Sequence, residues 1–103
     1  MNVLTQEEFN EKIVKASKNN KTFIEFMNYA VKDICIIVDV LSIRTTISFY
    51  NCRIEGICIS SSVKHLFTSN IFFSNCSIVD YEKVECISKA KIFHCAFIKT
   101  VPL

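Results

Sequence analysis

Six cysteines and two histidines are the side chains of this sequence best suited to metal binding or thiol catalysis. Zinc sites usually contain Cys-x-x-Cys pairs, but none occurs here, and five residues separate Cys52 from Cys58. His94 and Cys95 are adjacent, so on a strand they point to opposite faces and do not form the hydrogen-bonded pair that activates a thiol. His65 is expected to be a solvated loop residue. A metal-dependent or thiol enzyme is therefore only a minor alternative, and no catalytic residue, metal ligand or cofactor is predicted.

Three of the cysteines recur at a fixed place in a sequence repeat. Residues 22–36 align without a gap with residues 45–59, and two shorter copies begin at Ile71 and Ala90. One apolar position of the copies is occupied by Phe26, Phe49, Phe73 and Ile92, a second by Tyr29, Cys52, Cys76 and Cys95, and a polar position between them by Asn28, Asn51, Asn75 and His94. Self-similarity at an offset of 23 residues predicts stacked structural repeats.

Each copy alternates apolar and polar residues, which predicts short β-strands. A second short strand is predicted at 34–36 and 57–59, and Cys86-Ile87 is its expected equivalent in the third copy. Because about 20 residues are too few for a crossover helix, the equivalent strands are expected to stack in parallel as the coils of a β-solenoid. The Asn amides would then hydrogen-bond along the stack, and the cysteines would fill the core as free thiols.

Within the repeats, five-residue steps can be followed through Ile47, Cys52 and Ile57, and the phrase Phe-x-Asn-Cys-x-Ile occurs twice. This pattern resembles that of pentapeptide-repeat proteins, which are right-handed, four-sided parallel β-helices, and it covers about residues 22–100. The resemblance implies a mainly β protein, a small parallel β-solenoid of about four coils, in which dimerisation through the C-terminal coil is common. Repeat lengths of 23, 24 and 19 depart from a regular 20, so a looser β-helix or another β-rich fold is the alternative.

The region before the repeats is predicted to form an amphipathic helix over residues 5–18. Thr5 is the expected N-cap, and Glu8 completes a capping box three residues later. The apolar face of Phe9, Ile13 and Ala16 must lie on the solenoid, either as a cap on the first coil or as a cover over the outer wall. The chain is thus predicted to be a single domain, residues 1–103, with a helix at 5–18 and repeats at 22–100.

An apolar stripe is expected on the outer wall of the solenoid. If Phe49 and Cys52 point inward, the outward residues of the repeats are Met27, Tyr50, Phe72 and Phe93. Exposed aromatic side chains on a rigid wall are typical of protein-binding surfaces, so these four residues are the candidate binding site. The alternative is that the N-terminal helix covers them.

A second exposed surface is expected at the C-terminal coil, where Phe97, Ile98 and Val101 have no further coil to cover them. A homodimer through this coil would bury them. Pro102 is the counter-argument, because a proline lacks an amide donor and can itself protect a strand edge.

Composition and charge narrow the function classes. Half of the 103 residues are apolar, and a net charge of +2 argues against a nucleic-acid partner and against imitation of DNA. The longest apolar run, 34–38, is too short to span a membrane, and an acidic N-terminus without an apolar segment favours a cytoplasmic protein. The sequence therefore predicts a non-enzymatic module that binds and inhibits a protein partner. By size and analogy this includes anti-CRISPR or other anti-defence inhibitors of phages and mobile elements, and the alternative is a structural homo-oligomer subunit.

Overall fold

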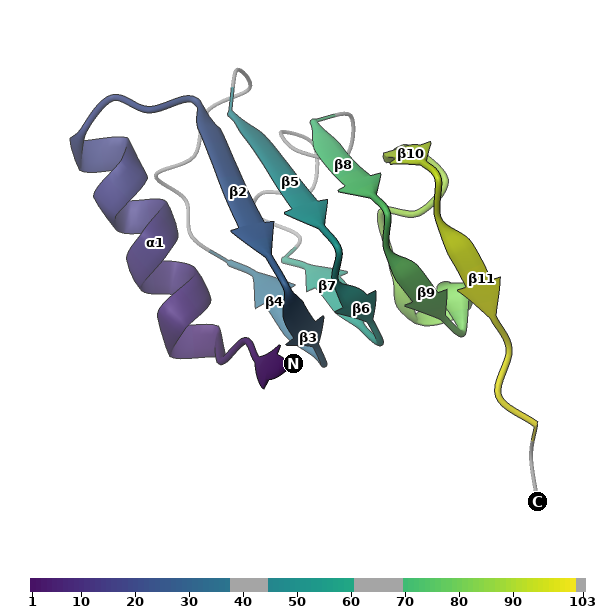
Figure 1. Cartoon of the computed structure of the whole chain (residues 1–103). Coiled ribbons are helices and arrows are strands. Elements are labelled where there is room, and N and C mark those ends of the chain that lie inside the picture. Colours follow the sequence, from purple (N-terminus) through teal and green to yellow (C-terminus); the bar gives the residue numbers. More distant parts are fainter. Residues whose placement is uncertain (38–44, 61–69, 102–103) are drawn as a thin grey trace.

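The protein, seen in a computed structural model, has one α-helix and eleven short strands among the residues that the structure describes, 1–37, 45–60 and 70–101 (Figure 1). The chain begins with β1 (Asn2–Val3) and α1 (Gln6–Lys18). The first repeat forms β2 (Phe23–Met27), β3 (Tyr29–Val31) and β4 (Ile34–Ile36), and the second forms β5 (Thr46–Tyr50), β6 (Arg53–Ile54) and β7 (Ile57–Ile59). The third forms β8 (Ile71–Ser74), β9 (Ser77–Val79) and the 3₁₀ helix η1 (Tyr81–Lys83), and the last forms β10 (Lys91–Phe93) and β11 (Ala96–Ile98). The expectation of a mainly β fold with an N-terminal helix is confirmed.

Equivalent strands of successive repeats pair in parallel. They form three sheets with the strand orders β10-β8-β5-β2, β1-β3-β6-β9-β11 and β4-β7. The pairing aligns Phe26 with Phe49, Phe49 with Phe73, and Phe73 with Ile92, so the predicted apolar column exists residue by residue. Parallel pairing without crossover helices follows from the short repeat, because each strand returns to the same sheet one repeat later.

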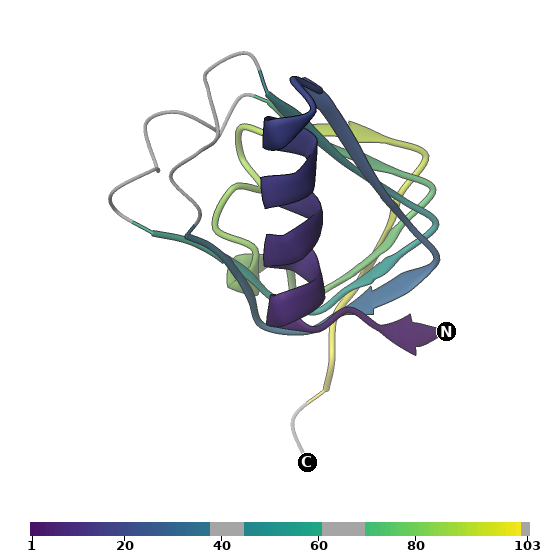
Figure 2. The same ribbon diagram turned by 90° about the vertical axis from the view of Figure 1, so that its left-hand side faces the viewer.

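The core is built on stacked phenyl rings. The ring centroids of Phe26 and Phe49 lie 5.5 Å apart, as do those of Phe49 and Phe73, and all three side chains are buried. Phe9 of α1 continues the stack at 5.0 Å from Phe26. Helix α1 lies across one end of the stack of paired strands, as the view in Figure 2 shows. The helix therefore closes this end of the core.

The beginning of α1 is as predicted. The Thr5 side chain accepts a hydrogen bond from the Glu8 amide, and the Glu8 carboxylate accepts one from the Thr5 amide, which completes the capping box. The apolar face of Phe9, Ile13 and Ala16 is buried. Local sequence is enough to predict the start and the buried face of this helix, because the cap and the burial pattern are both as expected.

The polar ladder between the first two strands of each repeat has a backbone role that the repeat pattern did not reveal. Asn28, Asn51, Asn75 and His94 have φ angles of 64°, 52°, 51° and 53°, in the left-handed region. Asn and His tolerate this conformation better than most residues, and the chain has a single glycine. The expected amide ladder is confirmed for one pair, in which Asn51 Nδ2 donates to Asn28 Oδ1 at 2.7 Å.

The prediction of a strand at Cys86-Ile87 is wrong. Asp80, with φ of 48°, turns the chain into η1, and the residue that meets β7 is Val84, through an isolated parallel bridge to Ile57. Cys86 follows in a turn and is buried. The inserted 3₁₀ turn shifts the register of the third repeat. The prediction was made by counting residues from the apolar anchor Phe73, and this count did not include the turn.

Candidate protein-binding surface

The outward face of the sheet β10-β8-β5-β2 carries three of the four predicted binding residues in one row. Strand pairing sets Met27 beside Tyr50, Tyr50 beside Ser74, and Ser74 beside Phe93. Met27, Tyr50 and Phe93 are 47%, 37% and 49% exposed. Alternation along each strand explains the row, because the neighbours of these residues form the buried column. We call Met27, Tyr50, Phe72 and Phe93 the aromatic wall.

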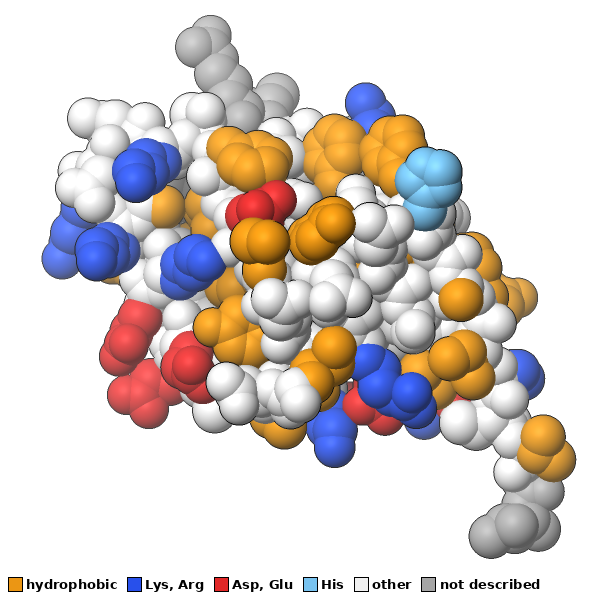
Figure 3. All heavy atoms as spheres, in the orientation of Figure 1, with side chains coloured by type: hydrophobic (Ala, Val, Ile, Leu, Met, Phe, Trp, Pro, Cys, Tyr) orange, Lys and Arg blue, Asp and Glu red, His pale blue; other side chains and the backbone are white. Residues whose placement is uncertain are grey.

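Phe72 lies in the adjacent row and is half-buried by its neighbours. Its ring stacks on that of Phe93, with centroids 6.1 Å apart and an interplanar angle of 11°, while Lys91 Nζ lies 5.4 Å from the Phe72 centroid. Viewed from this side, hydrophobic side chains gather over β2, β5, β8 and β10 (Figure 3). The wall thus offers flat aromatic area with a cation at its edge.

Phe23, at the start of β2, extends this surface and was not among the predicted residues. It is 58% exposed. The signal was present in the sequence, since residues 23, 25 and 27 share one face of a strand. Counting outward positions from the start of β2 would have found it.

Of the two predicted positions for the helix, the structure has the cap on the first repeat. Phe9 stacks on Phe26 at the edge of the core, and Phe9 and Ile13 are fully buried there. The aromatic wall lies on a different face and stays open to solvent. Met27, Tyr50 and Phe93, with part of Phe72, are therefore available for contact with another molecule.

The C-terminal end exposes the three residues that were predicted to form a dimer interface. Phe97, Ile98 and Val101 are 55%, 39% and 83% exposed. In the described part of the chain, the Phe97 ring meets the edge of one other ring, that of Tyr81, with centroids 6.3 Å apart. Three apolar side chains are therefore exposed at this end of the described structure, although Phe97 and Ile98, adjacent on β11, point to opposite faces.

An acid-centred network fastens the last residues to η1. Asp80 accepts hydrogen bonds from the Thr100 hydroxyl at 2.6 Å and the Thr100 amide at 2.9 Å. These bonds lower the pKa of Asp80. Glu82 and Lys99 form an exposed ion pair at 2.6 Å, which lowers the pKa of the carboxyl and raises that of the amine.

All six cysteines are free thiols, and Cys52, Cys76 and Cys86 are buried in the core. The expectation of core cysteines is wrong for Cys35 and Cys58, which alternate with the buried isoleucines of β4 and β7 and therefore face outward. Cys52, Cys76 and Cys95 each donate to a backbone carbonyl of the preceding repeat, at Phe26, Phe49 and Phe73, over 3.3 to 3.5 Å. The Cys76 pKa lies above its ordinary value because its thiol hydrogen-bonds to Cys52 and is buried. Burial raises the pKa of Cys58 to about 11 and that of Cys86 to about 12. Cys58, Cys76 and Cys86 therefore carry little thiolate at neutral pH and are poor nucleophiles. The hydrogen bond with Cys76 instead lowers the pKa of Cys52 to about 7, but this side chain is buried.

The remaining candidates for chemistry are dispersed. In the described part of the chain, no three His, Cys, Asp or Glu side chains come together as a metal site, and no helix is long and apolar enough to cross a membrane. His94 occupies its left-handed position next to Cys95, whose thiol donates to Phe73 and Phe93 carbonyls. His65 lies outside the described residues.

A scan against protein-family models, a search of curated proteins and a search of solved structures each found no match for this chain. Its geometry is therefore the basis on which a function is proposed.

Proposed function

We propose that this protein is a non-enzymatic interaction module that binds, and thereby inhibits, a protein partner through the aromatic wall. One observation carries the proposal: α1 covers the end of the core, so the side chains of Met27, Tyr50 and Phe93 are left exposed on a paired sheet. Exposed Tyr and Phe on a rigid surface supply large contact area at a small cost in side-chain entropy, which is why they dominate binding interfaces.

The scaffold in this proposal is a single β-solenoid of pentapeptide-repeat type. The residue-by-residue parallel registers, the left-handed Asn at the same place in three repeats and the helix across one end support it. In a solenoid, each repeat contacts only its neighbours, and the outer wall is built from one side-chain position of every repeat. Surface residues can then change without disturbing the core.

The wall favours a protein partner over a nucleic acid. Its exposed area is aromatic and aliphatic, with Lys91 placed on the ring of Phe72 instead of projecting as a separate charge. Binding to nucleic acid depends on many positive charges that neutralise phosphates, and the chain carries a net charge of +2. A partner with an apolar patch and a carboxylate at its rim is the complement of this surface.

The test is affinity capture from the lysate of the native host, followed by titration of the captured protein in purified form. Wild type is compared with a Tyr50→Ala, Phe93→Ala variant, and Tyr81→Ala serves as the matched control because Tyr81 is an exposed aromatic outside the wall. We expect the wall variant to keep its circular dichroism spectrum and to lose about tenfold or more in affinity, whereas the control binds as wild type. Equal binding by all three proteins would remove the wall from the proposal.

The exposed apolar side chains at the C-terminal end favour a second candidate, a structural homo-oligomer joined through Phe97, Ile98 and Val101. This candidate predicts sedimentation as a dimer or larger assembly that Phe97→Asp reduces to a monomer, because an unpaired charge in an apolar interface is costly. The wall variant would leave that assembly unchanged. Sedimentation of the two variants therefore separates the two functions.

A further inference from the structure

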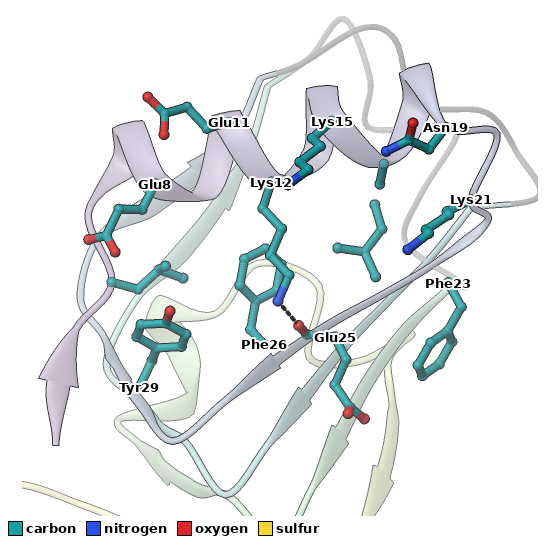
Figure 4. Close-up of a pocket in the computed structure, with 13 residues that line it drawn as sticks. Glu8, Glu11, Lys12, Lys15, Asn19, Lys21, Phe23, Glu25, Phe26 and Tyr29 are labelled. Atoms are coloured by element: carbon teal, nitrogen blue, oxygen red, sulfur yellow. Dashed lines mark hydrogen bonds between the residues drawn. The ribbon is translucent and has the colours of Figure 1, made fainter.

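A groove runs between α1 and β2. Its volume is about 720 Å³, and its floor includes Leu4, Ile24 and Phe26 (Figure 4). Ligand sites in proteins commonly have volumes of roughly 300–1,000 Å³. The groove is thus large enough for a short segment of polypeptide.

One side of the groove is an open strand edge. β2 is the last strand of its sheet, and the Thr46 amide donates to the Thr22 carbonyl while the Asn28 amide donates to the Tyr50 carbonyl. In a parallel ladder, every second residue faces the same neighbour, so Ile24 and Phe26 also face β5. The amides and carbonyls of Phe23, Glu25 and Met27 therefore face the groove.

The other two sheets have their corresponding edges covered. β1 pairs with β3, and the Leu4 amide continues this pairing to Ala30. The edge of β4 is satisfied by the Gln6 side chain, which accepts from the Cys35 amide at 2.8 Å and donates to the Cys35 carbonyl at 2.7 Å.

The edge of β2 has far less cover. Within residues 1–37, 45–60 and 70–101, its groove-facing groups have one hydrogen-bond partner, the Lys12 ammonium, which donates to the Glu25 carbonyl and lies 4.8 Å from the Phe26 ring centroid. An unpaired strand edge is a template for another strand. Among the described residues, β2 is thus the one of the three edges at this end that keeps this capacity.

Charges are ordered along the groove. Lys15 and Lys21 lie with Asn19 where β2 begins, and Glu8 lies near Tyr29 where β2 ends (Figure 4). An extended segment beside β2 would therefore be favoured if it placed an acidic residue at the lysine end and a basic residue at the Glu8 end.

We propose that the groove binds an extended segment of a partner protein, which adds to β2 as a further strand and places an acidic side chain between Lys15 and Lys21. The incoming amide replaces Lys12 at the Glu25 carbonyl. Backbone pairing supplies the affinity and the charge order supplies the specificity, as in other cases of strand addition. Because α1 closes the far side of the groove, one strand fits there, whereas a second copy of this protein would bring its whole sheet against the helix.

The probe is a displayed library of unconstrained peptides of about eight residues, long enough to cover the five residues of β2. Selection on the intact protein is expected to enrich sequences with β-branched residues in alternation and an Asp or Glu near one end. Amide hydrogen exchange then locates the bound peptide. We expect new protection at Phe23, Glu25 and Met27, while Ile24 and Phe26, already paired with β5, change little.

Two variants test the edge and the charges separately. Glu25→Pro removes a groove-facing amide without removing a bond to β5, and it is expected to weaken the selected peptides about tenfold or more, while Glu25→Thr changes affinity less than about twofold. Lys15→Glu with Lys21→Glu is expected to weaken binding similarly, and Lys18→Glu with Lys89→Glu is the charge-matched control outside the groove. This second pair decides the question if Glu25→Pro does not fold.

The proposal is overturned by an absence of enriched peptides, or by peptides whose binding neither variant weakens. Protection of the same three amides that rises with protein concentration when no peptide is present would instead assign the edge to a second copy of this chain. A Tyr50→Ala, Phe93→Ala variant must bind the peptides as wild type does, since neither Tyr50 nor Phe93 lines the groove. The experiments can therefore disprove the proposal for the aromatic wall and the proposal for the groove independently of each other.

Discussion

The two ends of the stack of strands differ in how far they bury the same core position. Strand pairing places Val31, Ile54, Ile78 and Phe97 in one column. Val31 at the helical end has no exposed surface, and neither do Ile54 and Ile78, whereas Phe97 at the other end is 55% exposed. Repetition brings like residues together, but burial of the outermost ones needs a cap.

The N-terminal residues provide that cap: β1 pairs with β3, and helix α1 supplies Phe9 and Gln6 in place of a preceding repeat. Phe9 extends the phenyl stack at 5.0 Å, close to the 5.5 Å between stacked repeats. The Gln6 amide pairs with the Cys35 backbone as a neighbouring strand would. At the other end, Phe97 has only the edge of Tyr81 as a ring partner in the described structure. The capped end should therefore hold more of the stability.

The largest expected effect comes from removing the phenyl ring that closes the core. Phe9→Ala should lower the free energy of unfolding by about 3–5 kcal/mol, because it leaves a cavity above Phe26. Phe97→Ala, the matched change at the opposite end, should cost less than about 1 kcal/mol, because the side chain is mostly exposed. Urea unfolding of both variants measures the difference.

Similar losses for Phe9→Ala and Phe97→Ala would contradict the comparison. A large loss at Phe97 alone would show that this end is covered in solution. Sedimentation of the Phe97→Ala protein then decides whether the cover is a second copy of the chain.

The next largest effect concerns the strand edge that α1 covers with a side chain. Gln6→Ala should cost about 1–3 kcal/mol, because it leaves the Cys35 amide and carbonyl without their partners at a part-buried site. Gln6→Glu keeps an acceptor for the Cys35 amide but loses the donor to its carbonyl, so an intermediate loss is expected. A Gln6→Ala protein as stable as wild type would mean that water replaces the side chain at no cost.

Sequence reasoning worked where the repeat or a local motif determined the position. Spacings of 23 and 24 residues between Phe26, Phe49 and Phe73 predicted their column, and the Thr5 and Glu8 pair predicted the start of α1. The place of the helix on the first repeat, left open between two positions, depends on contacts between residues far apart in sequence.

The same limit applies to what sequence reasoning missed at the sheet edges and in the third repeat. The Gln6 bonds to Cys35 span 29 positions and had no local signal. The 3₁₀ turn after Asp80 altered the third repeat, because one left-handed residue redirects the chain. For the aromatic wall, side-chain alternation predicted the correct face of the sheet, and Phe23 at the start of β2 was the residue left out.

A smaller effect compares the middle of the stack with its end. Asn51 and His94 both have left-handed backbones, so alanine at either position should cost about 1–2 kcal/mol from the same strain. Asn51 also donates to Asn28, and Asn51→Ala should cost about 0.5 kcal/mol more for that bond. Asn51→Gly relieves the strain and isolates the loss of the amide. Thermal unfolding of the three variants measures these differences, and a larger loss at His94 than at Asn51 would contradict the ladder.

The smallest expected effect is a pH dependence confined to the uncapped end. The Thr100 hydroxyl and amide donate to Asp80 and lower its pKa from the ordinary value of 3.8. A carboxyl with a lowered folded pKa contributes stability that is complete above its unfolded pKa and is lost as the pH falls through the folded pKa. Acidification below about pH 3.8 should therefore increase hydrogen exchange in β11, where the Ile98 carbonyl accepts from the Asp80 backbone amide.

In the Asp80→Asn variant this increase should disappear, because the side-chain amide of asparagine does not titrate. If β11 loosens equally in both proteins, the acid response comes from another group, and the Asp80 contacts do not hold this end.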